Sequence, residues 1–437
     1  MTESSVALPP GQRVAVVGAG IAGLASAYLL ARKHDVTLFE AGGYLGGHTN
    51  TVDVSLDGLR APVDTGFLVF NDRTYPNLIA LFDELGVSSI ASDMSFSVSV
   101  DGGALEWAGT NLNTVFAQRR NLYSPSFLGM LRDVLRFNAT AEEHLQHAIS
   151  KRQSVGELLA DNGYGQPFQH HYLLPMAAAI WSSRAADILH FPAATFLRFC
   201  LNHALLQIRH RPQWRTVAGG GRDYVRRMSA TLDDVRLRTP VQRVTRDPDG
   251  VTLSFGDGES QRFDAVVLAG HAPDSLRLLS NATPAEQRIL GAMRYQPNSA
   301  VLHTDPKLLP RRRRVWSAWN YVSQAGQVAQ AADMQRPVCV SYLLNQLQAL
   351  PFSSPVIVTL NPVEEPAPHT VLGRFAYEHP LLDLAAVDAQ LRLPELQGRQ
   401  RTWFAGAWTG YGFHEDGLKS ALRVASDFGV SPAWAKL

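Results

Sequence analysis

The sequence predicts an α/β (α+β) protein in which a domain built on a strand–helix–strand unit is interrupted twice by a second domain of mixed helices and sheet. Three observations predict this order. The chain opens with a βαβ pattern over residues 14–40, residues 127–149 and 168–207 have helical periodicity, and strand patterns return from Val235 before a last strand and helix. An interrupted first domain explains that order without long structureless loops.

The opening unit is short and strongly patterned. Val14 to Val17 is a β-branched run typical of a fully buried parallel strand, and Ile21 to Lys33, rich in Ala and Leu, predicts a helix. Val36 to Glu40 predicts the second strand. The unit is therefore complete within about thirty residues, a length typical of a βαβ motif.

The elements that follow are predicted from alternation and helical spacing. "TVDVSLDGLRAPVD" alternates around an Asp-Gly turn at Asp57-Gly58, and "SFSVSVDGGALEW" repeats this hairpin pattern. Helices are expected over 127–149 and 168–207. Strands return in "VTLSFGDGESQRFDAVVLAG", "PVCVSYLL" and "PVIVTL". A strand in "RTWFAGAW" and a helix from Asp416 to Phe428 then close the chain.

Composition excludes several classes of protein. The 437 residues are 46% hydrophobic and 18% charged, with a net charge of +1, so we expect two soluble globular domains and no nucleic-acid partner. Cys200 and Cys339 lie far apart and form no CxxC pair, so neither a disulfide framework nor a metal site is predicted. "MTESSVALPPGQR" lacks the pattern of a secretory signal, and glycines cross the most apolar stretch, "VAVVGAGIAGLASAYLL". We expect a cytoplasmic protein that at most associates peripherally with the inner face of the membrane.

A dinucleotide site is predicted where the first strand meets the first helix. Gly18, Gly20 and Gly23 form G-x-G-x-x-G at that junction. The first glycine allows a tight turn, the second lets the backbone approach a pyrophosphate, and the third lets the helix pack closely on the strand. The helix N-terminus offers free N–H groups to the phosphates. Glu40, twenty residues after Gly20 at the end of the second strand, suits the ribose hydroxyls. NAD and FAD both fit these residues.

The segment "EAGGYLGGH" separates the two cofactors. It resembles the acid, spacer and Gly-Gly-Arg segment of FAD-dependent amine oxidases and phytoene-type desaturases, and it places Gly46 and Gly47 along the flavin pyrophosphate. His48 replaces the family's arginine, so charge there depends on protonation. A capping or core role is the alternative for His48.

Three further segments resemble the same family. "VDTGFLVF" is similar to its D-x-G strand beside the flavin ring, "TPVQRV" to its adenine contact, and "FAGAWTGYGFHEDGLKSAL" to its C-terminal signature, in which Glu415 and Asp416 compete for the acid's place. The resemblance implies a Rossmann-type FAD-binding domain over 1–85, 215–285 and 395–437, and an amine-oxidase-like substrate domain over 86–214 and 286–394. The implied cofactor residues are Gly18, Gly20, Ile21, Ala22, Gly23, Glu40, Gly46, Gly47, His48, Thr49, Gly66, Phe67, Val241, Gly406, Ala407, Asp416, Gly417 and Leu418.

Departures from the family narrow the chemistry. The strand "QPNSAVLHTD" has no lysine of the kind that amine oxidases place near the flavin. Monoamine oxidases attach the flavin covalently to a cysteine in the region that "GRFAYEHP" matches, and neither cysteine of this chain lies near that segment. The FAD is therefore expected to be non-covalent, and oxidation of an amine is disfavoured.

A finer resemblance suggests the substrate. "GGHTNTV", "DTGFLVFN", "LEWAG", "YLLPMAAAIWS", "FPAATFLRF", "WRTVAGG" and the C-terminal signature resemble flavoproteins associated with cyclopropane-synthase-like methyltransferases, including a desaturase-like branch of furan fatty-acid formation. This resemblance implies a fatty-acyl chain of a phospholipid as substrate, oxygen or another electron acceptor, and a lipid methyltransferase as partner. Amine oxidation, flavin-dependent isomerisation and non-catalytic lipid binding are the rival functions.

The sequence also offers residues for such a reaction. Imidazole and phenol groups relay protons in apolar sites, so the proton-transfer candidates are Tyr411, His414, His171 and Tyr172, the first two favoured because they lie in the C-terminal signature. Apolar residues from Phe168 to Trp181 are candidates for an acyl tunnel, with ordinary core packing as the alternative. "KLLPRRRRVW" sets four arginines beside Leu308, Leu309 and Trp316. It predicts a peripheral membrane contact or, equally, a solvated loop.

Overall fold

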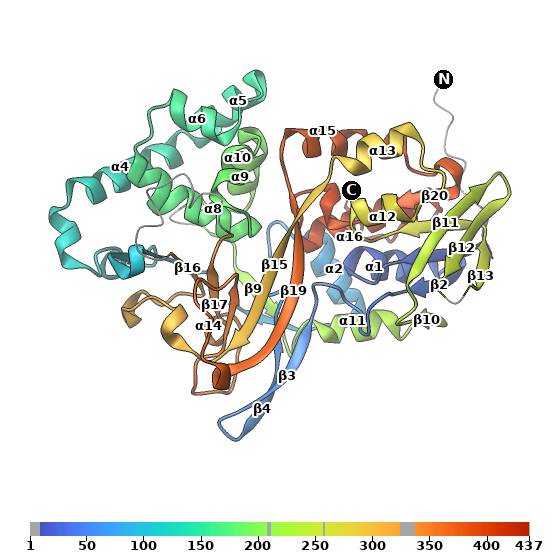
Figure 1. Cartoon of the computed structure of the whole chain (residues 1–437), viewed down its shortest axis with the longest axis horizontal. Coiled ribbons are helices and arrows are strands. Elements are labelled where there is room, and N and C mark those ends of the chain that lie inside the picture. The colour runs from blue at the N-terminus through green and yellow to red at the C-terminus, as the bar shows by residue number, and fades with distance from the viewer. Residues whose placement is uncertain (1–8, 208–210, 257, 324–336, 437) are drawn as a thin grey trace.

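The computed structural model describes residues 9–207, 211–256, 258–323 and 337–436. Two parts lie side by side in Figure 1: a parallel sheet covered by helices, and a mixed sheet beneath a lobe of helices. The first eight residues, where no secretory signal is predicted, lie outside the described residues. Within the described ranges, no helix combines the length and apolar character needed to cross a bilayer.

The parallel sheet has the strand order β10-β2-β1-β14-β20. Its strands are β1 (Arg13–Val17), β2 (Asp35–Phe39), β10 (Asp234–Arg236), β14 (Ala265–Leu268) and β20 (Thr402–Phe404). In β1, Val16 pairs with Leu38 on one side and Val267 on the other. Val14 and Val16 belong to one core layer and Ala15 to another, so β1 is buried on both faces, as its β-branched run predicted.

Helices α1 (Ile21–Leu30) and α16 (His414–Asp427) pack together on one face of this sheet. α1 ends three residues before the predicted end, because Ala31 to Lys33 form a turn in which the Lys33 carbonyl accepts from Gly11 N. α16 begins two residues before the predicted start, and the Asp416 carboxylate accepts from Phe413 N at 3.0 Å, capping the helix.

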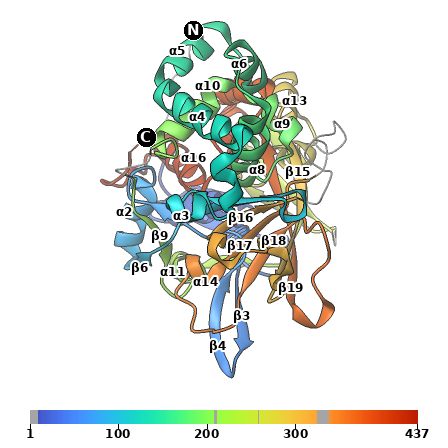
Figure 2. The same cartoon turned by 90° about the vertical axis from the view of Figure 1, so that its left-hand side faces the viewer.

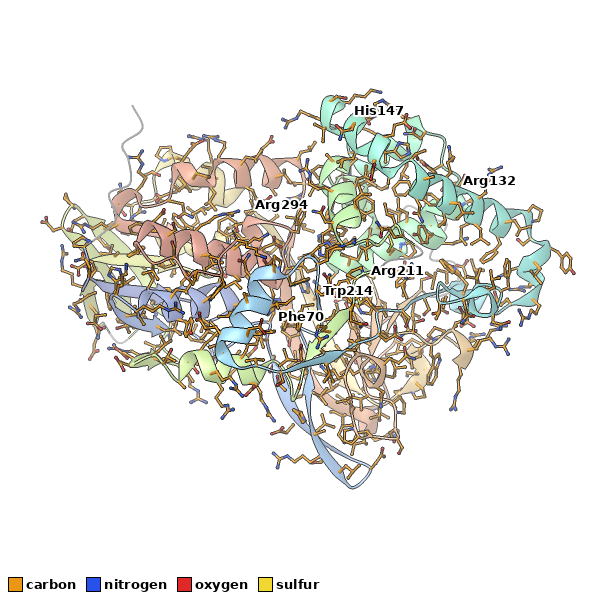
Figure 3. All side chains as sticks on the ribbon, turned by 180° about the vertical axis from the view of Figure 1, so that it is seen from behind. Phe70, Arg132, His147, Arg211, Trp214 and Arg294 are labelled. Atoms are coloured by element: carbon orange, nitrogen blue, oxygen red, sulfur yellow. The ribbon has the colours of Figure 1, made fainter. Side chains whose placement is uncertain are left out.

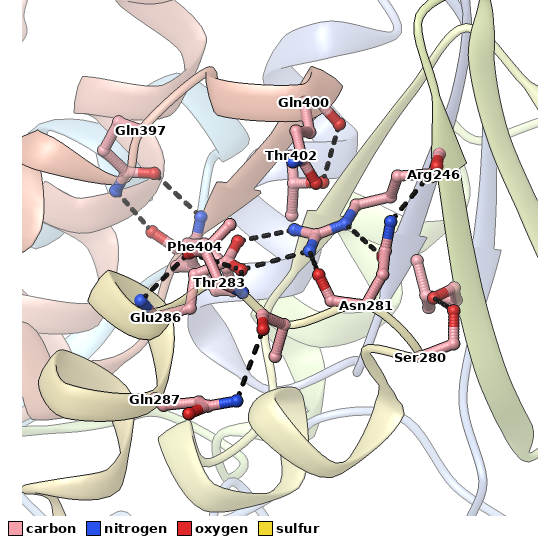
Figure 4. Close-up of polar contacts among 12 residues, drawn as sticks. Arg246, Ser280, Asn281, Thr283, Glu286, Gln287, Gln397, Gln400, Thr402 and Phe404 are labelled. Carbon is pink, nitrogen blue, oxygen red and sulfur yellow. Dashed lines mark hydrogen bonds and ion pairs between the residues drawn. The ribbon is translucent and has the colours of Figure 1, made fainter.

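The other face is covered by a three-stranded antiparallel sheet and two helices. They are β11 (Val241–Asp247), β12 (Gly250–Phe255), β13 (Ser260–Phe263), α12 (Ala272–Leu278) and α13 (Pro284–Gly291). A buried ion pair joins α13 to β11: Arg246 Nη2 lies 3.0 Å from Glu286 Oε2 and donates to the Asn281 carbonyl at 2.9 Å (Figure 4). This contact supports the strand that begins with Val241.

The second part is built on a seven-stranded sheet in the order β19-β15-β18-β17-β16-β7-β8. Its strands are β7 (Phe96–Val100), β8 (Leu105–Ala108), β15 (Arg294–His303), β16 (Trp319–Val322), β17 (Val340–Leu343), β18 (Ile357–Leu360) and β19 (Val371–Leu381). Only the β16–β7 pair is parallel. All seven strands fall in the segments predicted for the substrate domain; the exact domain boundaries stay a prediction.

A helical lobe covers this sheet (Figure 2), as the periodicity of residues 127–149 and 168–207 predicted, and a helix over Val155–Asp161, between these ranges, was not predicted. Its helices are α4 (Pro125–Ala139), α5 (Ala141–Lys151), α6 (Val155–Asp161), α7 (Gln166–Phe168), a π-helical turn (Gln169–Leu173), α8 (Leu174–Trp181), α9 (Ala185–Leu189) and α10 (Ala193–Asn202). The remaining helices are α2 (Pro76–Leu85), α3 (Leu112–Val115), α11 (Arg222–Ser229), α14 (Leu344–Leu347) and α15 (Leu384–Arg392).

Short strands connect the two parts. The predicted hairpin is β3 (Thr51–Leu56) and β4 (Leu59–Asp64), and both turn residues, Asp57 and Gly58, have positive φ, as its Asp-Gly sequence requires. A small sheet, β5-β9-β6, joins Phe70–Asn71, Trp214–Val217 and Ser89–Ala91. Figure 3 shows Phe70 and Trp214 near the middle of the molecule, between the two parts.

The structure corrects one expectation for "KLLPRRRRVW". Leu308 and Leu309 are 2% and 4% exposed, and Leu309 packs with Leu343, Ile357 and the half-buried Trp316. The apolar side chains of this segment therefore serve the protein core and cannot insert into a membrane, whereas all four arginines are exposed.

Candidate functional site

One cavity of about 750 Å³ runs from the glycine-rich loops of the parallel sheet to the aromatic residues beneath the helical lobe. We call these its nucleotide end and its substrate end. Of the predicted cofactor residues, the cavity is lined by Gly18, Gly20, Ile21, Ala22, Glu40, Gly46, Gly47, His48, Gly66, Phe67, Val241, Gly406 and Ala407.

The nucleotide end is formed mainly by backbone. Gly18, with φ +99°, makes the turn from β1 into α1, and a Cβ on Gly23 would lie 1.8 Å from the Gly18 carbonyl oxygen. The structure therefore confirms that Gly18 is needed for the turn and Gly23 for close packing of the helix. The second glycine segment lies alongside, because Gly46 N donates to the Ala19 carbonyl at 2.8 Å and Gly20 bridges to Gly46.

Glu40 holds these two segments at the cavity wall. Its Oε2 accepts from Ala19 N at 2.8 Å and its Oε1 from Gly42 N at 2.7 Å. Each carboxylate oxygen keeps acceptor capacity for a further donor. Glu40 is thus positioned and oriented, and its contact with a ribose stays a prediction.

The segment that follows β4 passes closely behind His48. A Cβ on Gly66 would lie 2.1 Å from the His48 carbonyl oxygen, and that oxygen accepts from Phe67 N at 2.8 Å. The Phe67 ring stacks on His414 with centroids 3.6 Å apart. Only glycine fits at position 66, a requirement that explains the D-x-G pattern physically.

Five predicted cofactor residues do not line the cavity: Gly23, Thr49, Asp416, Gly417 and Leu418. Asp416 caps α16, Leu418 is fully buried, and a Cβ on Gly417 would lie 2.8 Å from Ile21 Cγ2. These three residues of α16 serve the packing of α16 against α1. Glu415, the competing acid, points elsewhere and accepts from Leu78 N at 2.9 Å at the start of α2.

His48 stands in a group of partly buried imidazoles. Its ring lies 5.3 Å from that of His379 and 6.5 Å from that of His271. Burial first, and then the neighbouring His271, lowers the pKa of His48 to about 4, so the free protein holds it neutral at pH 7. One ring nitrogen bonds the backbone of Glu378, and Nε2 is buried without a hydrogen-bond partner in the described part of the chain.

That orphaned nitrogen tests the fit to FAD. A buried polar atom without a partner is costly. His48 lines the same cavity as Gly46, Gly47 and the first residues of α1, and the first turn of a helix has free N–H groups that suit a phosphate. A diphosphate there would accept from His48 and would raise its pKa. The residues present therefore fit the cofactor, and among the described lining residues there is no cysteine to attach it.

The substrate end is apolar and aromatic. It is lined by Met94, Ile180, Trp181, Phe199, Leu205, Trp214, Trp319, Tyr342, Leu360 and Tyr411, among others. The lining acids among the described residues are Glu40, Asp274 and Glu378, all at the nucleotide end, and no described lining residue is a lysine. Most of the expected tunnel residues, including Phe168 and Leu174, instead pack in the core of the helical lobe; Ile180 and Trp181 do line the cavity.

The proton-transfer candidates separate into two pairs. Tyr411 and His414 line the cavity, whereas His171 and Tyr172 are absent from its described lining. Tyr172 packs against Trp107 in the lobe, 6.1 Å between ring centroids. His171 and Tyr172 are therefore not brought to the site.

His414 is held by a short polar chain. Its Nε2 lies 2.8 Å from Thr49 Oγ1, which in turn contacts the Tyr224 hydroxyl. Burial, aided by His48, lowers the pKa of His414 to about 3, so its ring is neutral. Thr49 thus orients a lining residue although it does not itself reach the cavity.

His203 is a cavity residue that the sequence interpretation missed. The Phe199 carbonyl accepts from His203 Nδ1 at 3.0 Å, and this assigns the proton to Nδ1 and leaves Nε2 as an acceptor. Burial lowers the pKa of His203 to about 4, the backbone bond opposing this in part. The available signal was a histidine four residues after Phe199 on an apolar helix, a pattern more typical of core packing.

Comparison with known proteins agrees with this geometry. The family model described as flavin containing amine oxidoreductase matches residues 21–427. The chain is 30% identical to a carotenoid phi-ring synthase of Streptomyces griseus over 68% of this chain and 59% of that protein, and 26% identical to a phytoene dehydrogenase of the same organism over 68% and 60%. It thus spans about three fifths of the length of these relatives.

A solved structure has the same fold. The CLA-producing fatty acid isomerase from P. acnes aligns over 98% of this chain and 100% of that chain, with a TM-score of 0.65 and 16% identity. At this identity the likeness shows the fold alone.

Proposed function

Because the chain belongs to the family of flavin-containing amine oxidoreductases, whose FAD its nucleotide end fits, we propose that it is an FAD-dependent desaturase of a fatty-acyl chain. The expected substrate is an unsaturated or methylated acyl chain carried by a phospholipid. Oxygen or another electron acceptor would complete the cycle, and the finer resemblance to methyltransferase-associated flavoproteins suggests a lipid methyltransferase as partner.

The substrate end of the cavity carries this proposal. Aromatic and aliphatic side chains form its wall, and the acids among the described lining residues lie at the opposite end. An ammonium group entering there would lose its hydration without gaining a carboxylate, whereas an acyl chain would lose only contact with water. The chemistry of this wall favours an uncharged, apolar substrate.

The side chains have defined tasks in the proposed reaction. Bound FAD supplies the acceptor for the two electrons and one hydrogen that leave one carbon as hydride. The apolar wall orients the chain and excludes water. His203 Nε2 accepts the proton lost from the neighbouring or vinylogous carbon, because its tautomer leaves that nitrogen unprotonated. Tyr411 and His414 are the remaining candidates for passing that proton on.

One observation favours a second function, oxidation of an amine. Trp181, Tyr411 and other lining rings could hold a cation against their faces without a carboxylate. Flavin-dependent isomerisation is a third function, suggested by the fold shared with a fatty acid isomerase, and it would leave substrate and product with the same mass.

An anaerobic titration separates these functions. The purified holoprotein is mixed with phospholipid vesicles carrying unsaturated or methyl-branched acyl chains, or with amines, and the oxidised-flavin absorbance is followed. Bleaching by lipid, with a product two hydrogens lighter, supports the desaturase. Bleaching by amines alone supports amine oxidation. A lipid product of unchanged mass supports isomerisation, and tight lipid binding without bleaching or product supports a non-catalytic lipid-binding role.

A further inference from the structure

The end of the helical lobe farthest from the parallel sheet carries an excess of positive charge. Residues 104–137 contain Arg119, Arg120, Arg132 and Arg136, and residues 306–316 contain Lys307 and Arg311 to Arg314. All these basic residues are exposed. The two acids of these segments, Glu106 and Asp133, are buried and form ion pairs with Arg312 and with Arg136. Lys307 lies 3.7 Å from Asp305, so part of the basic charge is balanced, but the basic residues still outnumber these three acids. A chain of net charge +1 has therefore concentrated positive charge here.

Several contacts place the two segments on one surface. Arg312 Nη1 lies 2.7 Å from Glu106 Oε2, and Arg311 N donates to Glu106 Oε1 at 2.6 Å. Glu106 belongs to β8, and Gln118, just before the first arginine pair, donates to the Ala104 carbonyl at 3.1 Å at the start of that strand. The arginine run and the segment that leads into α4 thus both pack on β8.

Large apolar side chains are exposed among these arginines. Leu112, Leu122 and Tyr123 are 76%, 42% and 86% exposed. On α4, Leu128 and Leu135 are 43% and 58% exposed and lie seven residues apart, on the same side of the helix. Figure 2 turns this end of the molecule toward the viewer with α3 and α4 in front, and Figure 3 shows Arg132 reaching outward from α4.

We propose that this basic face is a docking surface for an anionic phospholipid bilayer. Basic side chains are attracted to the surface potential of anionic lipids, while leucine and tyrosine side chains enter the interfacial region. A nucleic acid could bind the basic residues through its phosphates, but it would leave the leucine side chains exposed to water. The inference goes beyond the proposed reaction and does not depend on it, because docking requires no turnover.

The surface replaces the one expected from the sequence. Leu308 and Leu309 are buried, and the exposed apolar residues come instead from α3, α4 and the turn between them. Arg311, Arg313 and Arg314 remain part of it, whereas Arg312 also serves the buried Glu106.

Vesicle co-sedimentation of the holoprotein tests the charges. Phosphatidylcholine vesicles with and without phosphatidylglycerol are compared for the native protein, for the triple variant Arg311→Gln, Arg313→Gln, Arg314→Gln, and for a control with Arg243→Gln, Arg288→Gln and Arg423→Gln. The control removes equal charge from exposed positions of β11, α13 and α16. We expect about hundredfold weaker binding to anionic vesicles in the first variant, at roughly fivefold per charge, and native binding in the control.

The apolar residues are tested separately. Leu128→Asn with Leu135→Asn should weaken vesicle binding that persists at high salt, while Leu391→Asn, at a 77% exposed position of α15, should not. Flavin content and the unfolding midpoint verify that each variant folds. The proposal is overturned if the native protein does not bind anionic vesicles, binds neutral ones equally, binds an RNA homopolymer more tightly, or if the triple variant matches its control. Flavin reduction by a detergent-dispersed acyl substrate reports on the proposed reaction independently.

Discussion

The two ends of the cavity are built differently. At the nucleotide end, the structure depends on close contacts between backbone segments. Gly18 adopts a positive φ, and Gly23 and Gly66 lie so close to carbonyl oxygens that a Cβ would clash. At the substrate end, side chains from segments distant in sequence, such as Met94, Phe199 and Leu360, meet to form a wall. The first kind of site leaves a local pattern of residue types. The second depends on tertiary packing and leaves none.

The largest expected effect is at the substrate end. Replacing His203 with Gln should slow single-turnover flavin reduction by the acyl substrate by roughly 10² to 10⁴-fold, the usual worth of a positioned base, and leave FAD affinity unchanged. In the native protein the pKa of His203 is about 4, so the rate should be flat from neutral pH down to that value and fall below it as Nε2 becomes protonated. Stopped-flow spectroscopy across pH measures both, and an unchanged rate in the variant would remove His203 from the mechanism.

The largest effect on stability is expected from the buried ion pair between Arg246 of β11 and Glu286 of α13. Arg246→Met leaves Glu286 of α13 buried without its cation, so the free energy of unfolding should fall by about 3–5 kcal/mol. Urea denaturation measures the change. The double variant Arg246→Met, Glu286→Leu should recover much of it, and a double variant as unstable as the single one would show that the charge is not the cause.

Two glycines of one motif should separate folding from cofactor binding. Gly23→Ala forces a Cβ against the Gly18 carbonyl and should cost about 1–3 kcal/mol of stability as well as flavin content. A Cβ on Gly20 would have no described atom within 4 Å, so Gly20→Ala should fold normally and lose FAD alone. Thermal unfolding of the apoproteins and flavin absorbance distinguish the two, and equal loss of stability would contradict the distinction.

The smallest effect is expected at His48. Removing a hydrogen bond to a phosphate in His48→Ala should weaken FAD binding by about tenfold. Because the anion favours the protonated ring, the complex has a pKa above the value of about 4 in the free protein, and native affinity should increase as pH falls. Fluorescence titration with FAD measures this, with His369→Ala, an exposed histidine, as control. An unchanged affinity and pH profile would show that His48 has only a packing role.

The sequence by itself determined the nucleotide end. The spacing from Gly18 to Glu40, the Gly46–Gly47 pair and the turn at Asp57-Gly58 are local, because backbone conformation depends on a few neighbouring residues. The coarse order of βαβ unit, helical segment, strands and final strand–helix pair also followed from local periodicity, whereas the helices α2, α11, α12, α13 and α15 were not predicted. The parallel sheet appears with the strands that this periodicity predicted.

Only the tertiary structure decided which side chains share the cavity. The sequence made His171 a candidate proton acceptor and did not single out His203. Packing places His203 at the cavity wall and His171 in the lobe, where its carbonyl accepts from Trp107 Nε1. Leu308 and Leu128 are equally apolar, and packing buries one and exposes the other. The physical reason is that apolar character sets the gain from burial, whereas the surface that provides the burial comes from residues far away in the chain.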